Sequence, residues 1–222
     1  GLRWKRGHVV SFTSLQGPWN GKAAPITKPS SRYSNSLAGM LASMARPPAA
    51  RSRALDAFAR ILVSHGERAA TLEAVAEAAE ISKGGLLYHF GSKDELVAGL
   101  VERLRELIVE DVAEMNADPQ GPTSYILRTS AEFDTEFEQV YIAVVTLAQS
   151  GHAEARRALD EADSAWVEAV TEEIGDGAVA RAAVLISDGI YAHAAVQRGP
   201  TGHDIDELRG LVAELVAARR RK

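Results

Sequence analysis

The sequence predicts an all-α fold, with a three-helix domain near the N-terminus and a larger helical domain after it. Apolar residues recur every three or four positions along most of the 222-residue chain, which is the period of a helix with one buried face. No stretch alternates apolar and polar residues as a half-buried strand does. Segments with glycine or proline at 118–122, 175–177 and 199–202 separate the helical stretches. We therefore expect domains at 51–98 and 99–222, after an extension over residues 1–50.

The composition excludes several kinds of protein. The chain has no cysteine, which excludes disulfides, thiolate metal sites and a cysteine nucleophile, and a cytoplasmic setting fits. Arg and Glu interrupt each apolar stretch before it reaches the ~18 residues of a membrane span, so we expect no membrane contact. The formal net charge is -5, but a charged partner responds to the local field, and the acidic residues concentrate away from the polar helix face described below.

Residues 1–50 differ from the rest of the chain. They contain no acidic residue, are rich in Ser, Gly and Pro, and show no helical period, so we expect them to be disordered. The N-terminal glycine suggests a trimmed tag or an extended reading frame, with Met44 as the native start. The alternative is a basic arm that binds nucleic acid. Its basic residues are Arg3, Lys5, Arg6, Lys22, Lys28, Arg32 and Arg46.

The first folded helix is predicted over residues 51–65. Leu55, Phe58, Ala59 and Leu62 occupy positions i, i+3, i+4 and i+7, and Gly66 follows as a stop. We expect this helix to pack across the two helices that come next.

Residues 71–96, TLEAVAEAAEISKGGLLYHFGSKDEL, predict two short helices, a tight turn and the start of a long third helix. Thr71 is the expected N-cap of the first short helix. One face of that helix carries Leu72, Val75, Ala76 and Ala79, and the acidic residues Glu73, Glu77 and Glu80 point outward.

The second short helix follows a turn of about three residues, a length typical of a helix-turn-helix. Ile81 is expected to fill the turn, and Ser82 is placed to cap the helix. Its expected buried positions are Leu86 and Phe90.

The third helix is predicted to begin at Lys93. Gly91 is expected to end the preceding helix as a C-terminal glycine. Ser92 and Glu95 have the spacing of a capping box, in which each side chain accepts a hydrogen bond from the other residue's backbone.

The outward face of the second short helix carries an unusual set for a surface: Lys83, Gly84, Gly85, Leu87, Tyr88 and His89. Two glycines in a first turn cost about 1 kcal/mol each relative to alanine, so helix propensity did not select them. Without side chains there, the helix can enter a DNA major groove closely, with Lys83 reaching a guanine edge and Tyr88 and His89 reaching phosphates. Lys93 and the free amides of the next helix would form a second phosphate clamp. The alternative is an ordinary helical hairpin with a polar outer face.

The segment SKGGLLYHFGSKDEL resembles the recognition segment of TetR/AcrR-family repressors, whose usual form is Val-Ser-Lys-Gly-x-Leu-Tyr-x-His/Tyr-Phe followed by Ser-Lys-x-x-Leu. The resemblance covers residues 51–100 and implies base contacts from Lys83 and Gly84. Leu87 stands where the family most often has a phosphate-binding tyrosine, and an apolar contact to a thymine methyl would replace that bond. The phosphate contacts that the resemblance implies come from Thr71, Ser82, Tyr88, His89 and Lys93.

The remaining helices form the larger domain. The third helix runs over residues 92–116 and links the two domains, and later helices are predicted at 154–174, 178–198 and 204–219. In the family that the chain resembles, the last two helices pair with their copies in a four-helix dimer interface. The alternative is that they are core helices of a monomer. Their small residues, which allow close helix contact, are Ala180, Ala182, Ala183, Ala192, Ala194, Ala195, Ala213 and Ala217.

No catalytic constellation is recognisable. The chain has no Gly-x-Ser-x-Gly, His-Glu-x-x-His or Walker motif, so we expect neither an enzyme nor a bound cofactor or metal. Asp188, Tyr191 and His193 lie close on one helix, and a satisfied polar pair between the first two is favoured over a ligand site. An aromatic set is expected to be core, pocket lining for a small-molecule effector, or both. It comprises Phe133, Phe137, Tyr141 and Trp166.

Together these features predict a ligand-responsive transcriptional repressor that binds a palindromic double-stranded operator as a homodimer. Two alternatives stay open. One is a helical enzyme or ligand carrier that has kept a helix-turn-helix, and the other is an activator with the same DNA-binding domain.

Overall fold

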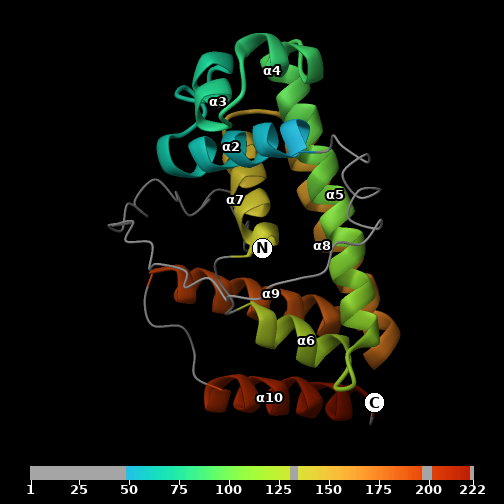
Figure 1. The fold of residues 1–222 in the computed structure, drawn as a ribbon. Coiled ribbons are helices and arrows are strands. Elements are labelled where there is room, and N and C mark those ends of the chain that lie inside the picture. The colour runs from blue at the N-terminus through green and yellow to red at the C-terminus, as the bar shows by residue number, and fades with distance from the viewer. Residues whose placement is uncertain (1–48, 131–134, 197–201, 221–222) are drawn as a thin grey trace, which may run out of the picture.

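The computed structural model describes residues 49–130, 135–196 and 202–220, and these residues form helices joined by short turns (Figure 1). The predicted all-α fold is confirmed. The expectations for most of residues 1–50, and for Phe133, fall outside the described residues. None of the described helices has both the length and the apolarity that a membrane crossing requires.

Three short helices form one end of the molecule, which we call the head: α2 (Ala49–His65), α3 (Leu72–Ala78) and α4 (Lys83–His89). α2 lies across both other helices, as predicted, and Gly66 ends it in the left-handed conformation with φ 76°. The predicted apolar face of α2 is buried, with Phe58 fully enclosed. Val75 of α3 and Leu86 of α4 meet it, so a few side chains hold the three helices together.

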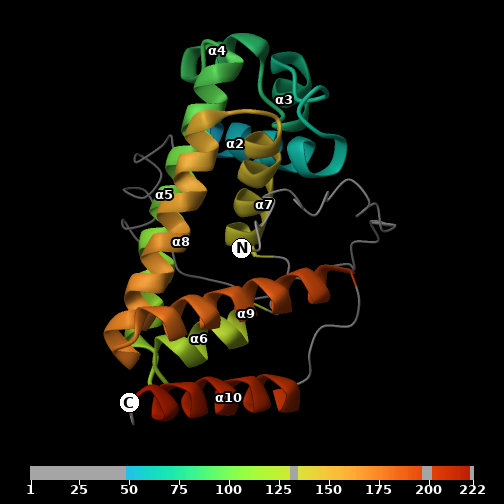
Figure 2. The ribbon, with the colours of Figure 1, turned by 180° about the vertical axis from the view of Figure 1, so that it is seen from behind.

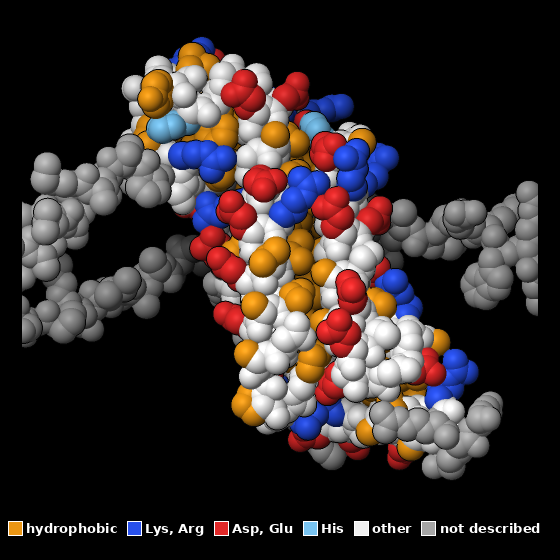
Figure 3. All heavy atoms as spheres, turned by 90° about the vertical axis from the view of Figure 1, so that its right-hand side faces the viewer, with side chains coloured by type: hydrophobic (Ala, Val, Ile, Leu, Met, Phe, Trp, Pro, Cys, Tyr) orange, Lys and Arg blue, Asp and Glu red, His pale blue; other side chains and the backbone are white. Residues whose placement is uncertain are grey.

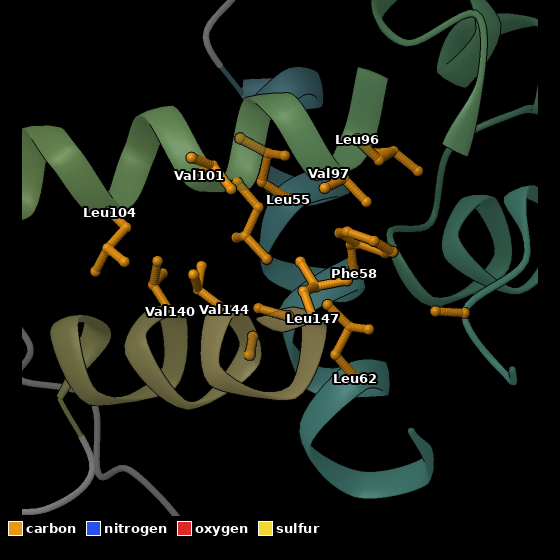
Figure 4. Packing of buried hydrophobic residues seen from close by; sticks show 14 of the residues in the cluster. Leu55, Phe58, Leu62, Leu96, Val97, Val101, Leu104, Val140, Val144 and Leu147 are labelled. Carbon is orange, nitrogen blue, oxygen red and sulfur yellow. The ribbon is translucent and has the colours of Figure 1, made fainter. Parts of the chain in front are cut away.

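Helix α5 (Lys93–Ala117) starts in the head and runs along the larger part of the molecule (Figure 1). Its start at Lys93 is confirmed. Figure 4 shows α5, α2 and α7 (Glu136–Gln149) packed around shared side chains, among them Leu55, Leu104 and Leu147. The same buried cluster continues to the alanines of α8 (Ala153–Ile174), so the head and the helices behind it have a common core.

The second cluster of buried residues lies at the other end of the molecule (Figure 2). It joins α6 (Pro122–Thr129), α9 (Gly177–Val196) and α10 (Gly202–Arg220) to the distal part of α8. Val170 and Leu127 are fully buried in it.

The long helices begin and end within two residues of their predicted bounds. Glycine and proline interrupt the apolar period at those places.

Ion pairs fix α8 along α5. Arg105 of α5 lies 3.5 Å from Glu154 and 2.8 Å from Glu161, both of α8. The space-filling view of this side shows several acidic side chains over the two helices, with basic side chains between them (Figure 3). The pKa of the Glu161 carboxyl is lowered, chiefly by its hydrogen bond from Arg105.

Gly121 sits at a tight junction between α6 and α8. Its φ is +85°, and an added Cβ would collide with the carboxylate of Glu173. That carboxylate accepts hydrogen bonds from the backbone N–H of Thr123 at 2.8 Å and from its hydroxyl at 2.5 Å. Glu173 thus accepts a hydrogen bond in the first turn of α6, where backbone N–H groups have no partner within the helix.

We expect Gly121→Ala to destabilise the protein more than Gly175→Ala does. Gly175 has a similar φ of +75° with open space around it. Its substitution therefore costs only the strain of an alanine in the left-handed conformation, about 1–2 kcal/mol. Gly121→Ala adds displacement of Glu173 and loss of its bonds to Thr123. Chemical denaturation of both variants measures the difference, and equal free energies of unfolding would contradict the assigned role of Glu173.

Candidate nucleic-acid interface

Side-chain caps set the positions of α3 and α4. The Thr71 hydroxyl accepts a hydrogen bond from Ala74 N at 3.2 Å, and the Ser82 hydroxyl accepts one from Gly85 N at 3.0 Å. Both predicted N-caps are confirmed. Ile81 packs against the common core, as expected of the turn residue.

The turn between α3 and α4 contains a feature that sequence reasoning missed. Glu80 has φ 54°, the single positive φ of a non-glycine among the described residues. A Gly or Asn would have indicated that conformation, but a glutamate gives no such signal. Ile81 N donates to Ala76 O at 3.0 Å, which closes the turn directly after Glu80.

The junction between α4 and α5 differs from its prediction in two details. Gly91 does not take the left-handed conformation of a C-terminal glycine: α4 ends at His89, and the extended residue Phe90 is its C-cap. Glu95 N donates to the Ser92 hydroxyl at 3.2 Å, as predicted, but the Glu95 carboxylate accepts from Gly91 N at 2.9 Å and not from Ser92. Burial of Phe90 turns the chain here, and this places the Gly91 amide within reach of Glu95.

The outward face of α4 is open to solvent. Tyr88 is 86% exposed and Leu87 41% exposed. The ring of Tyr88 stands edge-on to that of His89, with 5.1 Å between centroids. Such a large exposed apolar and aromatic surface on one short helix is typical of a binding face.

The two glycines of α4 have different structural explanations. A Cβ on Gly85 would lie 3.2 Å from the Ser82 hydroxyl, so glycine there leaves room for the cap. A Cβ on Gly84 would meet nothing within 4 Å. The fold therefore does not require glycine at position 84.

Both lysines that were expected to bind DNA have acidic partners in the structure. Lys83 Nζ lies 2.5 Å from Glu73 Oε1 of α3. Lys93 Nζ donates to the backbone oxygen of Glu67 at 2.7 Å and lies 3.3 Å from Glu67 Oε1. The hydrogen bond from Lys83 is the largest cause of the lowered pKa of Glu73, and the bond from His152 is the largest cause of the lowered pKa of Glu67. Sequence reasoning missed both pairs because each joins positions on different elements.

Three of the four predicted aromatic residues come together between α7 and α8. Phe137, Tyr141 and Trp166 have ring centroids 6.0 to 6.3 Å apart. Trp166 Nε1 donates to Asp111 Oδ2 of α5 at 2.8 Å, and burial raises the pKa of that carboxyl. Burial also raises the pKa of Tyr141 to about 12. We call Phe137, Tyr141 and Trp166 the aromatic cluster.

The polar residues of α9 do not assemble into a metal site. Burial raises the pKa of the Tyr191 hydroxyl, and its hydrogen bond to Glu138 of α7 adds to the shift. His193 Nδ1 lies 3.2 Å from the carbonyl oxygen of Gly189. Throughout the described part of the chain, no three His, Asp or Glu side chains come close enough to hold a metal ion together.

Comparison with known proteins gives a consistent family. Residues 54–100 match the model of bacterial regulatory proteins, tetR family. A member of the TetR family from Streptomyces coelicolor A3 is 26% identical, with a TM-score of 0.55 over 76% of this chain and 98% of that chain. No curated protein sequence matches.

Two further solved structures share the fold. The multidrug binding protein EbrR, complexed with malachite green, has a TM-score of 0.59 at 23% identity, over 74% of this chain and 96% of its own. Salmonella enterica GusR has a TM-score of 0.62 at 14% identity, over 79% of this chain and 99% of its own. The head with its helix-turn-helix, the matched family model and the shared fold confirm the predicted family. The head is therefore a DNA-binding domain of the tetR family of bacterial regulatory proteins, and the described chain shares its fold with solved TetR-family regulators.

Proposed function

We propose that this protein is a repressor that binds a palindromic DNA operator as a homodimer in the cytoplasm and releases it when a small apolar molecule binds. The observation that carries the proposal is the outward face of α4, where Gly84 leaves the backbone uncovered beside the exposed Lys83 and Tyr88. A helix with this surface, held by caps at a fixed angle to α3, suits entry into a major groove.

The contacts with DNA divide into two groups. Lys83 and the Gly84 backbone would meet base edges, and the exposed Leu87 would meet a thymine methyl. The hydroxyls of Thr71 and Ser82 accept bonds from the helix amides, yet each keeps its own hydrogen to donate to a phosphate. The other proposed phosphate ligands are Tyr88, His89 and Lys93, with Gly85 close to the backbone.

The first test compares two lysine variants. Lys83→Ala is expected to weaken binding to a duplex selected by the parent protein and to relax its sequence preference, by about 1–3 kcal/mol of discrimination. Lys93→Ala is expected to weaken binding to selected and random duplexes alike, and to reduce the slope of log affinity against log salt concentration by about one. Titrations at several salt concentrations measure both. If both variants bind both duplexes like the parent, the face of α4 is not the DNA interface.

The effector site is proposed at the aromatic cluster, together with Phe133. Solved structures with this fold include EbrR with malachite green and with ethidium, and SmeT with triclosan. The cluster is connected to α5, because Trp166 bonds Asp111, and α5 begins at the phosphate-binding Lys93. A ligand that separates these rings would bind better to a form with shifted α5, and so favour a state in which the two heads no longer match the operator.

Trp166 allows a direct test of the effector site. Trp4 and Trp19 are the other tryptophans, so a Trp4→Phe, Trp19→Phe background isolates its emission. An apolar dye that releases DNA is expected to change this emission, and Phe137→Ala is expected to weaken dye binding about tenfold, as loss of a buried aromatic contact does. A dye that releases DNA without either effect binds elsewhere.

The dimer interface is proposed on α9 and α10. Leu185 of α9 is 60% exposed, and Leu211 and Leu215 of α10 are 46% and 38% exposed. Helices α9 and α10 lie away from the head, so two copies joined there would present two α4 helices, as a palindrome requires (Figure 1).

Charge placed on this face should separate the protomers. The double variant Leu185→Glu, Leu215→Glu is expected to sediment as a monomer. Its footprint on selected DNA is expected to shrink to a weakly bound half-site. Val109→Glu is the matched control, because Val109 is 70% exposed but lies on α5. A variant that stays dimeric would place the interface on another face.

The two alternatives predict different outcomes in a gel-shift assay with DNA upstream of the gene. An enzyme or carrier that only retained the head would show no preference for that DNA. An activator would bind it, and a transcription assay with the purified protein separates activation from repression.

A further inference from the structure

Glu67 lies where the head meets the turn between α7 and α8. It follows the left-handed Gly66, so its side chain leaves the end of α2 toward α5. Its carboxylate oxygen Oε1 lies 3.3 Å from Lys93 Nζ and 3.1 Å from His152 Nε2. Ser150 also donates to this carboxylate. One acidic side chain therefore contacts the lysine at the start of α5 and two residues of the α7–α8 turn.

The two oxygen groups of Glu67 act differently on Lys93. The backbone carbonyl accepts a hydrogen bond from Nζ at 2.7 Å, which orients the ammonium group. The carboxylate partly neutralises it. A phosphate that approaches Lys93 must share the ammonium with this anion, and both side chains are only about one-third to one-quarter exposed, at 34% and 25%. The pair is therefore screened less than one at the open surface.

His152 competes with Lys93 for the same oxygen. Its Nε2–H donates a hydrogen bond to Oε1, and this bond weakens the interaction of Oε1 with Lys93. If the turn moves away, Oε1 is left to Lys93 alone. The position of the α7–α8 turn is thereby connected to the charge that α5 presents to DNA.

We propose that Glu67 is a positioning residue that sets the strength of the Lys93–phosphate contact, and that His152 adjusts it from the α7–α8 turn. The inference rests on the proposed function, since it takes Lys93 as a phosphate ligand. The pair of Lys83 and Glu73 has no such connection: both side chains are mostly exposed, at 58% and 66%, and both belong to the head.

The test uses the full chain and a duplex selected by the parent from a random library. Glu67→Gln keeps the backbone carbonyl but removes the anion, so binding is expected to tighten about fivefold, or about 1 kcal/mol. His152→Ala is expected to weaken binding about twofold to threefold, because Oε1 loses the competing bond from His152 and interacts more strongly with Lys93, while Ser150 keeps its bond to the carboxylate. His152→Gln can still donate an N–H to Oε1 and is expected to restore binding close to that of the parent. Thermal melting of each variant identifies any loss of folding.

Double variants distinguish this mechanism from a general charge effect. In the Lys93→Ala background, Glu67→Gln is expected to have no effect, and in the Glu67→Gln background, His152→Ala is expected to have none. Glu77→Gln is the matched control, because it removes one exposed negative charge from α3. Its effect on binding should be smaller and should not depend on Lys93.

Two results would overturn the proposal, and they differ from each other. If Lys93→Ala weakens binding but Glu67→Gln acts equally with and without Lys93, the role of Glu67 is wrong and the proposed DNA contact stands. If Lys93→Ala binds like the parent, the phosphate contact itself is wrong, and the role of Glu67 fails with it.

Discussion

A seven-residue helix has too few internal hydrogen bonds to be stable alone, so α4 depends on the contacts that surround it. Leu86 anchors its inner face, Phe90 holds its end, and Ser82 caps its start. None of these contacts involves Tyr88, which is why its side chain can be almost fully exposed. The arrangement of α2 and α3 follows from the same requirement, because their apolar faces supply the surface on which Leu86 is buried.

The connection between the head and the rest of the molecule is a shared core and not a flexible linker. Helix α5 contributes Leu96 and Leu100 to the head and Leu104 and Ile108 to the contacts with α7 and α8. Arg103 of α5 adds polar contacts at the same place, with Asp56 of α2 at 2.9 Å and with Glu136 of α7. A displacement of α7 or α8 is therefore transmitted to α2 and α5 through side chains in direct contact.

The parts that could be predicted from the sequence are those decided by neighbours in the chain. The period of Leu55, Phe58 and Leu62, and the caps Thr71 and Ser82, depend on residues within one or two turns. The contacts that escaped prediction join distant segments: Lys93 with Glu67, and Glu67 with His152, are fixed only once α2, α5 and α7 have packed together. Glu80 and Gly91 escaped for a related reason, since the packing of Ile81 against the core and the burial of Phe90 override the local backbone preference there.

Gly84 has a consequence for the dynamics of the head. Glycine at this position lowers the helix-forming tendency of the first turn of α4, and the surrounding fold gains nothing in packing from the missing side chain. Local opening of that turn therefore requires less free energy than opening of α5, whose 25 residues are anchored along their length. The first turn of α4 can thus adjust its backbone by local fluctuation, while Leu86 and Phe90 keep the direction of the helix unchanged.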